Sequence, residues 1–208
     1  MASGANGSQN RRRVAELAAR IMADEGVEHY HLAKRKAADR LGIKAPREVP
    51  DNSEIAAHLS AYQRLFQAQR QPRWLRAQRE TALEAMRLLG RFDPMLAGPV
   101  LDGSAARQAM ACLHVFAETP EEVSYFLLEH AIPFTVHERT VRQNSRERTA
   151  CPCFRFMAGE VGIELVVFPP IFKRQAPLSP VDGKPMARAD FAFVEALVRP
   201  PHQRGHQP

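Results

Sequence analysis

Apolar residues in the first 92 positions recur with the period of amphipathic helices. The first run, spaced i, i+3, i+4 and i+7, consists of Val14, Leu17, Ala18 and Ile21. Repeats of this spacing predict four helices, at about residues 11–25, 29–41, 51–66 and 72–89. The third should open at a capping box made by Asp51 and Glu54, and its buried face should include Ile55, Leu59, Tyr62 and Phe66.

After Asp93 the pattern changes to short apolar runs typical of strands. We expect strands at 112–117 and 133–142, and a hairpin with arms at 153–157 and 162–168. Thr119, Pro120 and Glu122 have the spacing of a helix start, so a helix should run to about His130. A Pro/Gly-rich loop at 178–185 precedes one last short helix carrying Phe191, Val194 and Val198.

This order of elements predicts an α+β protein. A basic helical region at 11–92 is joined to a small mixed-sheet domain at 93–199, and the polar tails at 1–10 and 200–208 should be disordered. No run of 18 apolar residues exists, and no apolar segment follows the basic start. We therefore expect neither a membrane span nor a secretion signal, and a cytoplasmic location.

Positive charge is concentrated in the helical region, although the composition, with 45% hydrophobic and 25% charged residues, is that of an ordinary globular protein. Residues 1–92 carry 17 Lys/Arg against 10 Asp/Glu, whereas residues 93–208 carry 12 against 13. A basic patch is expected at Lys34, Arg35, Lys36 and Arg40. It is either a solvated helix surface or a contact with an anionic partner such as RNA or an acidic protein.

The sheet region contains a set of residues with the order found in nucleotidyltransferases. A Gly-Ser turn at Gly103-Ser104 follows an apolar segment at Val100-Leu101 that we expect to be a strand, a second strand follows at 112–117, and Glu164 lies on a later strand. Residues 96–168 thus resemble a nucleotidyltransferase core. The resemblance implies a nucleotide phosphate held at Gly103, Ser104 and Arg107, and divalent metal bound by two alternating carboxylates together with a third.

The two alternating carboxylate positions are occupied by Met110 and Cys112. A thioether and a thiol are soft ligands that bind magnesium poorly, so we predict no metal, no cofactor and no nucleotidyltransferase activity. The leading hypothesis is a pseudoenzyme, a non-catalytic module that binds a nucleotide or RNA. Loss of metal chemistry does not remove a phosphate-binding turn.

Other sites remain open in the sequence. One alternative is an enzyme whose site combines Glu164 with residues of the proline-rich loop, namely Arg174, Ser179, Asp182 and Lys184. A zinc site at Cys151 and Cys153 with His114 and His137 is disfavoured, because structural zinc sites space paired cysteines two residues apart. Cys112 is expected to be a small core residue rather than a nucleophile.

Two further resemblances bear on DNA binding and on enzymatic activity. The first two helices resemble the start of a TetR-type helix-turn-helix, but prolines at 46 and 50 occupy the place of a recognition helix, so sequence-specific DNA binding is not expected. The chain is also similar to short bacterial chains described as UDP-N-acetylmuramate–alanine ligase. Such a ligase needs Gly-Lys-Thr/Ser, whereas Gly183-Lys184 precedes a proline here. A helical protein-interaction module is the third alternative.

Overall fold

The computed structural model describes residues 3–27, 29–43, 45, 48–66, 71–144 and 147–199. Within these ranges it contains seven α-helices and a six-stranded mixed sheet, which confirms the predicted α+β class. The tail at 200–208 lies outside the described residues. Contacts divide the chain into a helical unit and a sheet unit. The helical unit contains the chain up to Pro72 with Ser104–Ala109 and Pro180–Gly183, and the sheet unit contains Arg73–Gly103, Met110–Ser179 and the chain from Lys184 onward.

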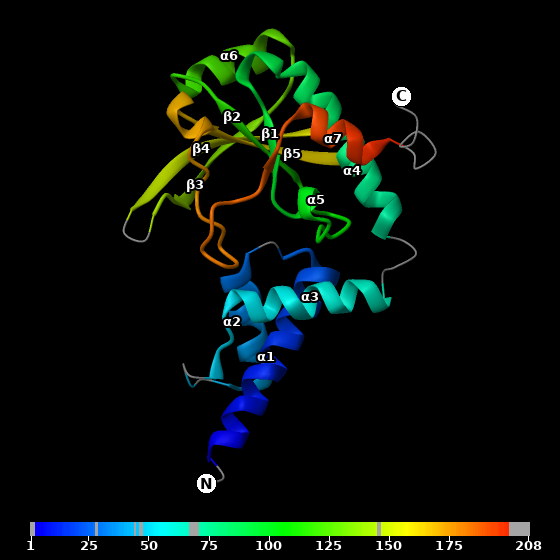
Figure 1. The fold of residues 1–208 in the computed structure, drawn as a ribbon, viewed down its shortest axis with the longest axis vertical. Helices are drawn as coiled ribbons and strands as arrows, with labels where there is room; N and C mark the ends of the chain where they lie inside the picture. The colour runs from blue at the N-terminus through cyan, green and yellow to red at the C-terminus, as the bar shows by residue number, and fades with distance from the viewer. Residues whose placement is uncertain are drawn as a thin grey trace, which may run out of the picture. The chain divides into compact units, whose positions relative to one another are not determined.

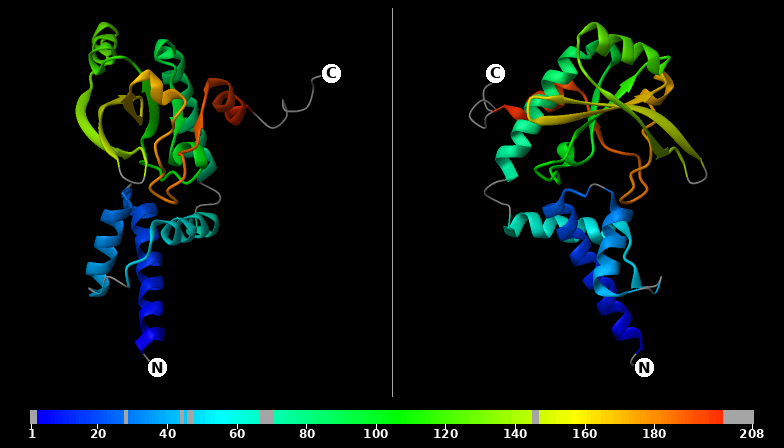
Figure 2. Two further views of the ribbon diagram at one scale, coloured as in Figure 1. Left: turned by 60° about the vertical axis from the view of Figure 1, so that its left-hand side comes forward. Right: turned by 180° about the vertical axis from the view of Figure 1, so that it is seen from behind.

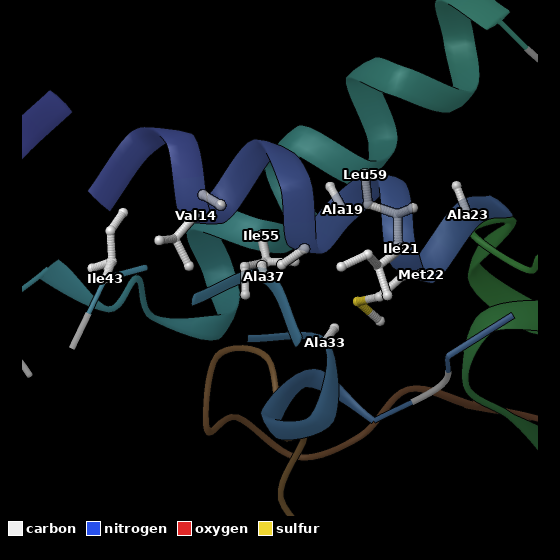
Figure 3. Close-up of a cluster of buried hydrophobic side chains, with 12 residues drawn as sticks. Val14, Ala19, Ile21, Met22, Ala23, Ala33, Ala37, Ile43, Ile55 and Leu59 are labelled. Atoms are coloured by element: carbon white, nitrogen blue, oxygen red, sulfur yellow. The ribbon is translucent and has the colours of Figure 1, made fainter. Parts of the chain in front are cut away.

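Three helices form the core of the helical unit: α1 (Ser3–Glu25), α2 (Tyr30–Leu41) and α3 (Asn52–Phe66). Their apolar stripes meet in one cluster, shown in Figure 3, that includes Val14, Ile21, Ala33, Ala37, Ile55 and Leu59. The predicted buried faces are therefore confirmed, with one exception. Phe66, expected in the core, is 71% exposed.

The first helix is longer than predicted. Residues 3–10, expected to be disordered, are helical, because α1 begins at Ser3. Its polar first turns have a partner outside the apolar core, since the Asn10 side-chain amide donates to Glu48 Oε2 at 3.1 Å. A contact of this kind does not appear in a hydrophobic pattern, which explains the error.

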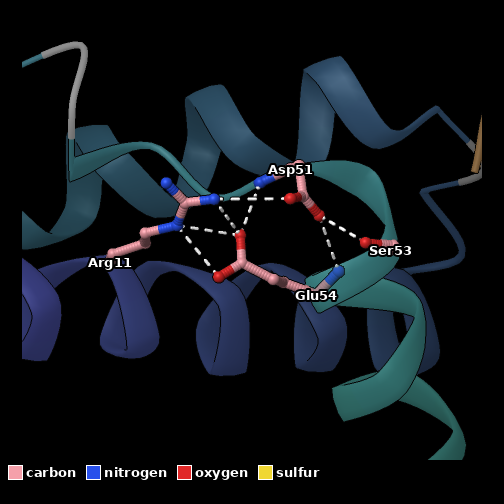
Figure 4. Close-up of polar contacts among 4 residues, drawn as sticks. All are labelled: Arg11, Asp51, Ser53 and Glu54. Carbon is pink, nitrogen blue, oxygen red and sulfur yellow. Dashed lines mark hydrogen bonds and ion pairs between the residues drawn. The ribbon is translucent and has the colours of Figure 1, made fainter.

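The predicted capping box of α3 is present and is extended by an arginine. Glu54 N donates to Asp51 Oδ1 at 2.9 Å, and Asp51 N donates to Glu54 Oε2 at 2.8 Å. Arg11 of α1 donates to both carboxylates, at 2.6 Å to Glu54 and 3.3 Å to Asp51, as Figure 4 shows. The start of α3 is therefore tied to α1 by charge-assisted hydrogen bonds.

The sheet unit is built on one mixed sheet with strand order β3-β4-β5-β2-β1-β6 (Figures 1 and 2). Its strands are β1 (Met95–Ala97), β2 (Ala111–Phe116), β3 (Thr135–Arg142), β4 (Arg148–Ala158), β5 (Val161–Phe168) and β6 (Arg188–Ala189). Its helices are α4 (Gln71–Leu88), α5 (Pro99–Asp102), α6 (Pro120–Glu129) and α7 (Phe191–Val198), with 3-10 turns η2 (Gly90–Phe92) and η3 (Pro170–Lys173). No helix in the described ranges combines the length and apolar character needed to cross a bilayer.

The two central strands run parallel and carry the site. All six residues of β2 are buried, and so are the last six of β5, Ile163–Phe168. Strands covered on both faces read as continuous apolar runs, as these do. The exceptions on their shared face are the buried polar residues His114 and Glu164.

Most of the predicted elements of the sheet unit are confirmed: β2, β3, the β4–β5 hairpin, α6 and α7. The apolar segment before Gly103 was wrongly expected to be a strand, because Pro99–Asp102 forms the helical turn α5 and the strand β1 lies earlier. Contacts also place α4 in the sheet unit from Arg73 onward, whereas the predicted boundary was 92/93. Arg79 of α4 donates to the carbonyls of Val100 and Leu101 at 2.9 Å each.

Candidate anion site on the sheet

The sheet brings together the three positions that the nucleotidyltransferase resemblance singles out. Cys112 on β2 lies directly opposite Glu164 on the parallel strand β5. Met110 lies two residues before Cys112, and a Cβ atom placed on Gly162 would be 3.0 Å from its side chain. Cys112 and Glu164 therefore lie side by side on one face of the sheet. Met110, which precedes β2, packs against Gly162, and Gly162 shares that face with Glu164 because strand residues two apart share a face.

Glu164 is a buried carboxylate held by two guanidinium groups and a histidine. Its side chain is 3% exposed. Arg155 on β4 donates to Oε1 from Nε at 3.0 Å and from Nη2 at 2.7 Å. His137 on β3 contacts Oε1 through Nε2 at 3.0 Å, and Arg139 donates to Oε2 through Nη1. The carboxylate is therefore an anchor with both oxygens engaged.

Arg139 lies between Cys112 and Glu164. The same Nη1 atom that donates to Glu164 lies 3.5 Å from the Sγ atom of Cys112. A protein side chain therefore supplies positive charge between these two positions.

The ion cluster, which we define as Glu164, Arg139, Arg155 and His137, carries more positive than negative charge. Burial would raise the pKa of Glu164, but the charge of Arg139, with the charge and hydrogen bonds of Arg155, outweighs this and lowers the pKa. One ionised carboxylate then faces two guanidinium groups. The arginines also reach solvent, since their side chains are 32% and 37% exposed.

Cys151, Cys153 and the buried His114 on this face are not set up for nucleophilic chemistry. Burial raises the pKa of Cys151 to about 11 and the pKa of Cys153 to about 12, so both stay protonated. Burial, with the charges of Arg188 and Arg139, lowers the pKa of His114 to about 3. These residues pack with Phe116, Val166 and Phe168 as core.

The predicted phosphate turn does not have the geometry expected of it. The Gly103 amide donates to the Pro99 carbonyl at 3.0 Å and closes α5, so it does not point at a ligand. The Ser104 carbonyl accepts from Gln63 Nε2 at 2.7 Å. Arg107 is exposed. Gly103 is thus the C-cap of α5, and its own amide is used within that helical turn.

The proline-rich loop closes on itself, and its residues are not among the side chains that hold Glu164, which are those of Arg139, Arg155 and His137. Ser179 N donates to the Lys184 carbonyl at 2.7 Å, and Met186 N donates to the Pro177 carbonyl at 2.8 Å. Arg174 ends η3, and its side chain is exposed. Asp182 is counted with the helical unit and Lys184 with the sheet unit. The loop is a small closed hairpin, and the cations that hold Glu164 come from β3 and β4.

The basic patch on α2 is partly neutralised within the helical unit. Lys36 and Arg40 both contact Glu25, at 3.2 and 2.6 Å. Burial lowers the pKa of Lys34. Arg35 is exposed. The excess of basic residues counted in the sequence therefore overstates the charge that this helix presents.

The cations of the ion cluster were not predicted as site residues, although part of the signal is in the sequence. In a hairpin that turns at 159–160, Arg155 must lie opposite Glu164, and the structure has this register. His137 and Arg139 share one face of β3, but which strand they would flank was not evident. No group of three His, Cys, Asp or Glu side chains suited to metal occurs in the described part of the chain.

Comparisons with protein-family models, with curated proteins and with solved structures give no match to this chain. Inference about its function therefore starts from the ion cluster itself.

Proposed function

We propose that this chain is a non-catalytic module that binds a phosphate-bearing ligand, a nucleotide or RNA, and does so without metal. The observation that carries the proposal is the position of Arg139, whose guanidinium lies between Cys112 and Glu164. A fixed cation at this place can neutralise phosphate oxygens as a bound metal ion would. A cytoplasmic location belongs to the same proposal.

The chemistry of the two arginines supports a phosphate-bearing ligand. A guanidinium group presents five donors in a planar fork that fits two phosphate oxygens at once. Glu164 accepts from Nε and Nη2 of Arg155 and from Nη1 of Arg139, and about a third of each arginine side chain reaches solvent. A buried carboxylate that orients exposed guanidinium groups lowers the entropy lost when they bind an anion.

The geometry supports this site over the Gly103-Ser104 turn that the resemblance implies. The turn amide is used within α5, whereas the ion cluster has surplus positive charge. The proposal therefore keeps the class of ligand and moves its phosphate to Arg139 and Arg155.

An enzyme that uses Glu164 as a general base is less well supported. A general base needs an accessible oxygen and a pKa near neutrality. Glu164 is 3% exposed, and its pKa lies below the ordinary carboxyl value because Arg139 and Arg155 outweigh the effect of burial. A carboxylate in this state holds other groups in place.

The proposal is tested by binding measurements with and without magnesium. We would titrate ATP and a short single-stranded RNA into the full chain in EDTA, and repeat the titration with magnesium chloride. We expect at least one of them to bind in EDTA with unchanged affinity when magnesium is added. Arg155→Ala should weaken that binding by about tenfold or more, since charge-assisted hydrogen bonds contribute about 1.5–3 kcal/mol.

The matched control is Arg148→Ala, which removes an exposed arginine from the same strand outside the ion cluster. It should bind as the natural chain does, and melting curves of both variants check folding. Binding that requires magnesium, or an Arg155→Ala variant with full affinity, would contradict the proposal. So would a failure of both ligands to bind.

A further inference from the structure

The helical unit has an apolar groove that its core does not explain. Its floor is formed by Leu17 and Leu41 with Tyr62, Leu65 and Phe66 of α3. Leu65 is 76% exposed and Phe66 is 71% exposed, while the residues on the other face of α3, Ile55 and Leu59, fill the core. The helix α3 therefore carries a second apolar stripe near its C-terminal end.

The rim of the apolar groove is positively charged. Arg13, Glu16 and Arg20 line it from α1. Glu16 accepts a hydrogen bond from Arg12 at 2.8 Å, so its negative charge is balanced by a residue outside the groove. Arg20 lies over the Tyr62 ring with its Cζ atom 6.0 Å from the centroid. An occupant with acidic side chains beside its apolar face would complement this rim.

We infer that the apolar groove docks an amphipathic helix of another protein whose polar face is acidic. Leucine-type anchors at i, i+3, i+4 and i+7 would lie along Leu17, Tyr62 and Phe66, as in other helix-in-groove complexes. Acidic residues flanking these anchors would meet Arg13 and Arg20. The surface is independent of the ion cluster and of any nucleotide or RNA bound there.

The test uses a fluorescent synthetic peptide with leucines at i, i+3, i+4 and i+7 and glutamates on its other face. We expect saturable binding to the full chain that weakens with added salt, and about tenfold weaker binding of a peptide with lysines in place of glutamates. The double substitution Leu65→Ser with Phe66→Ser should reduce affinity about tenfold or more, because buried anchors dominate such interfaces.

Leu128→Ser is the matched control, since Leu128 is 62% exposed and lies on α6 of the sheet unit. It should leave peptide binding unchanged. Equal binding of the lysine peptide, or full affinity in the Leu65→Ser/Phe66→Ser variant, would overturn the inference.

Two other measurements also bear on the occupant. If the double variant melts well below the natural chain, the groove is covered by part of this chain, and the inference fails. If sedimentation shows a concentration-dependent dimer that the double variant loses, the occupant is a second copy. We expect the natural chain and the double variant to have the same melting curve and to be monomers.

Discussion

The two units of the molecule differ in their ion pairs: both have exposed pairs, such as Lys173 with Asp93 in the sheet unit, but among the described residues only the sheet unit has a buried carboxylate. In the helical unit, the ion pairs are exposed and acids offset arginines and lysines, as Glu25 does for Lys36 and Arg40. In the described part of the sheet unit, one buried carboxylate, Glu164, holds two arginines and a histidine. The helical unit, with 13 Lys/Arg against 9 Asp/Glu, thus neutralises much of its excess charge, whereas the sheet unit, with 16 against 14, concentrates positive charge in the ion cluster.

This difference shows why net charge was a poor guide to the candidate site. Exposed ion pairs contribute little to the free energy of unfolding, because water and salt screen them. A buried carboxylate orients its partners, and removing it alone destabilises the fold. An anion-binding site needs fixed positive charge in excess of its local negative charge. The ion cluster meets this condition with two arginines on neighbouring strands.

The largest expected effect tests whether the helical unit depends on its apolar core instead of its ion pairs. Ile55 is fully buried between the three helices, with 0% exposure. Ile55→Ala should lower the free energy of unfolding by about 4 kcal/mol, from lost burial and the cavity left behind. Urea unfolding would measure the change, and Ile171→Ala, at a 71% exposed site, is the control. A loss below about 1 kcal/mol would mean that the core is not the main source of stability.

The next effect tests the buried carboxylate of the ion cluster. Glu164→Gln keeps the shape but leaves Arg139 and Arg155 without their counter-charge, and should cost about 2–3 kcal/mol at pH 7, less than a fully buried pair because solvent reaches both arginines. Glu160→Gln, in the exposed turn of the same hairpin, should change little.

The pH dependence of this loss has a definite sign. The pKa of Glu164 is lowered in the folded state, because the charges of Arg139 and Arg155 outweigh burial, so the carboxylate stabilises the fold above its unfolded pKa of about 4.3. That contribution disappears as the pH falls through the lower folded value. The difference between the natural chain and Glu164→Gln should therefore shrink in acid. A difference that stays constant from pH 7 to strongly acidic conditions would show that packing, not charge, explains the loss.

Much of the fold could be predicted from local patterns. The capping residues Asp51 and Thr119, the hairpin turn at 159–160 and the apolar spacing of α1 to α4 each act over a few residues, so the sequence states them directly. The parallel pairing of β2 with β5 could not be predicted in the same way. Those strands are separated by α6, β3 and β4, and their partnership depends on long-range packing.

The site was predictable to the same extent. Glu164 was recognised, and Arg155 could have been placed opposite it from the hairpin register. Arg139 and His137 depend on how β3 pairs with β4 through a turn that includes residues outside the described ranges. Gly103 and Ser104 stay a prediction as a phosphate site, and the structure adds that Gly103 ends the helical turn α5, which a Gly-Ser pair does as readily as it binds phosphate.

A smaller effect on stability is expected at His114, the second buried polar residue of the sheet in addition to Glu164. Glu164 has three partners, whereas His114 Nδ1 finds no hydrogen-bond partner among the described residues. Burial, with nearby arginines, lowers the pKa of His114 to about 3, so the unfolded chain binds a proton that the folded chain does not between about pH 6.5 and that value. The stability of the natural chain should fall as the pH falls through this range. At pH 7 the free energy of unfolding of His114→Leu should be within about 1 kcal/mol of that of the natural chain. As the pH falls, the variant should lose less stability than the natural chain, by about 1 kcal/mol for each pH unit.

Urea unfolding at pH 7, 6 and 5 would measure the effect, with His58→Leu as the control for a histidine of the helical unit. A His114→Leu variant with the same pH dependence as the natural chain would contradict the assignment of a neutral, buried imidazole.

The smallest expected effect concerns the exposed ion pairs of the helical unit. It tests whether these pairs contribute as little to stability as their exposure indicates. Glu25→Gln removes the acid shared by Lys36 and Arg40, all of which contact solvent. Because water and salt already screen these charges, we expect no resolvable change in the melting midpoint at low or high salt. The substitution also releases two cations on α2, so RNA affinity is the more sensitive measurement. If RNA binds the ion cluster, its affinity should be almost unchanged in Glu25→Gln and should still fall in Arg155→Ala. A large gain in RNA affinity from Glu25→Gln, with no loss from Arg155→Ala, would place the anion site on α2 and reverse the roles assigned to the two units.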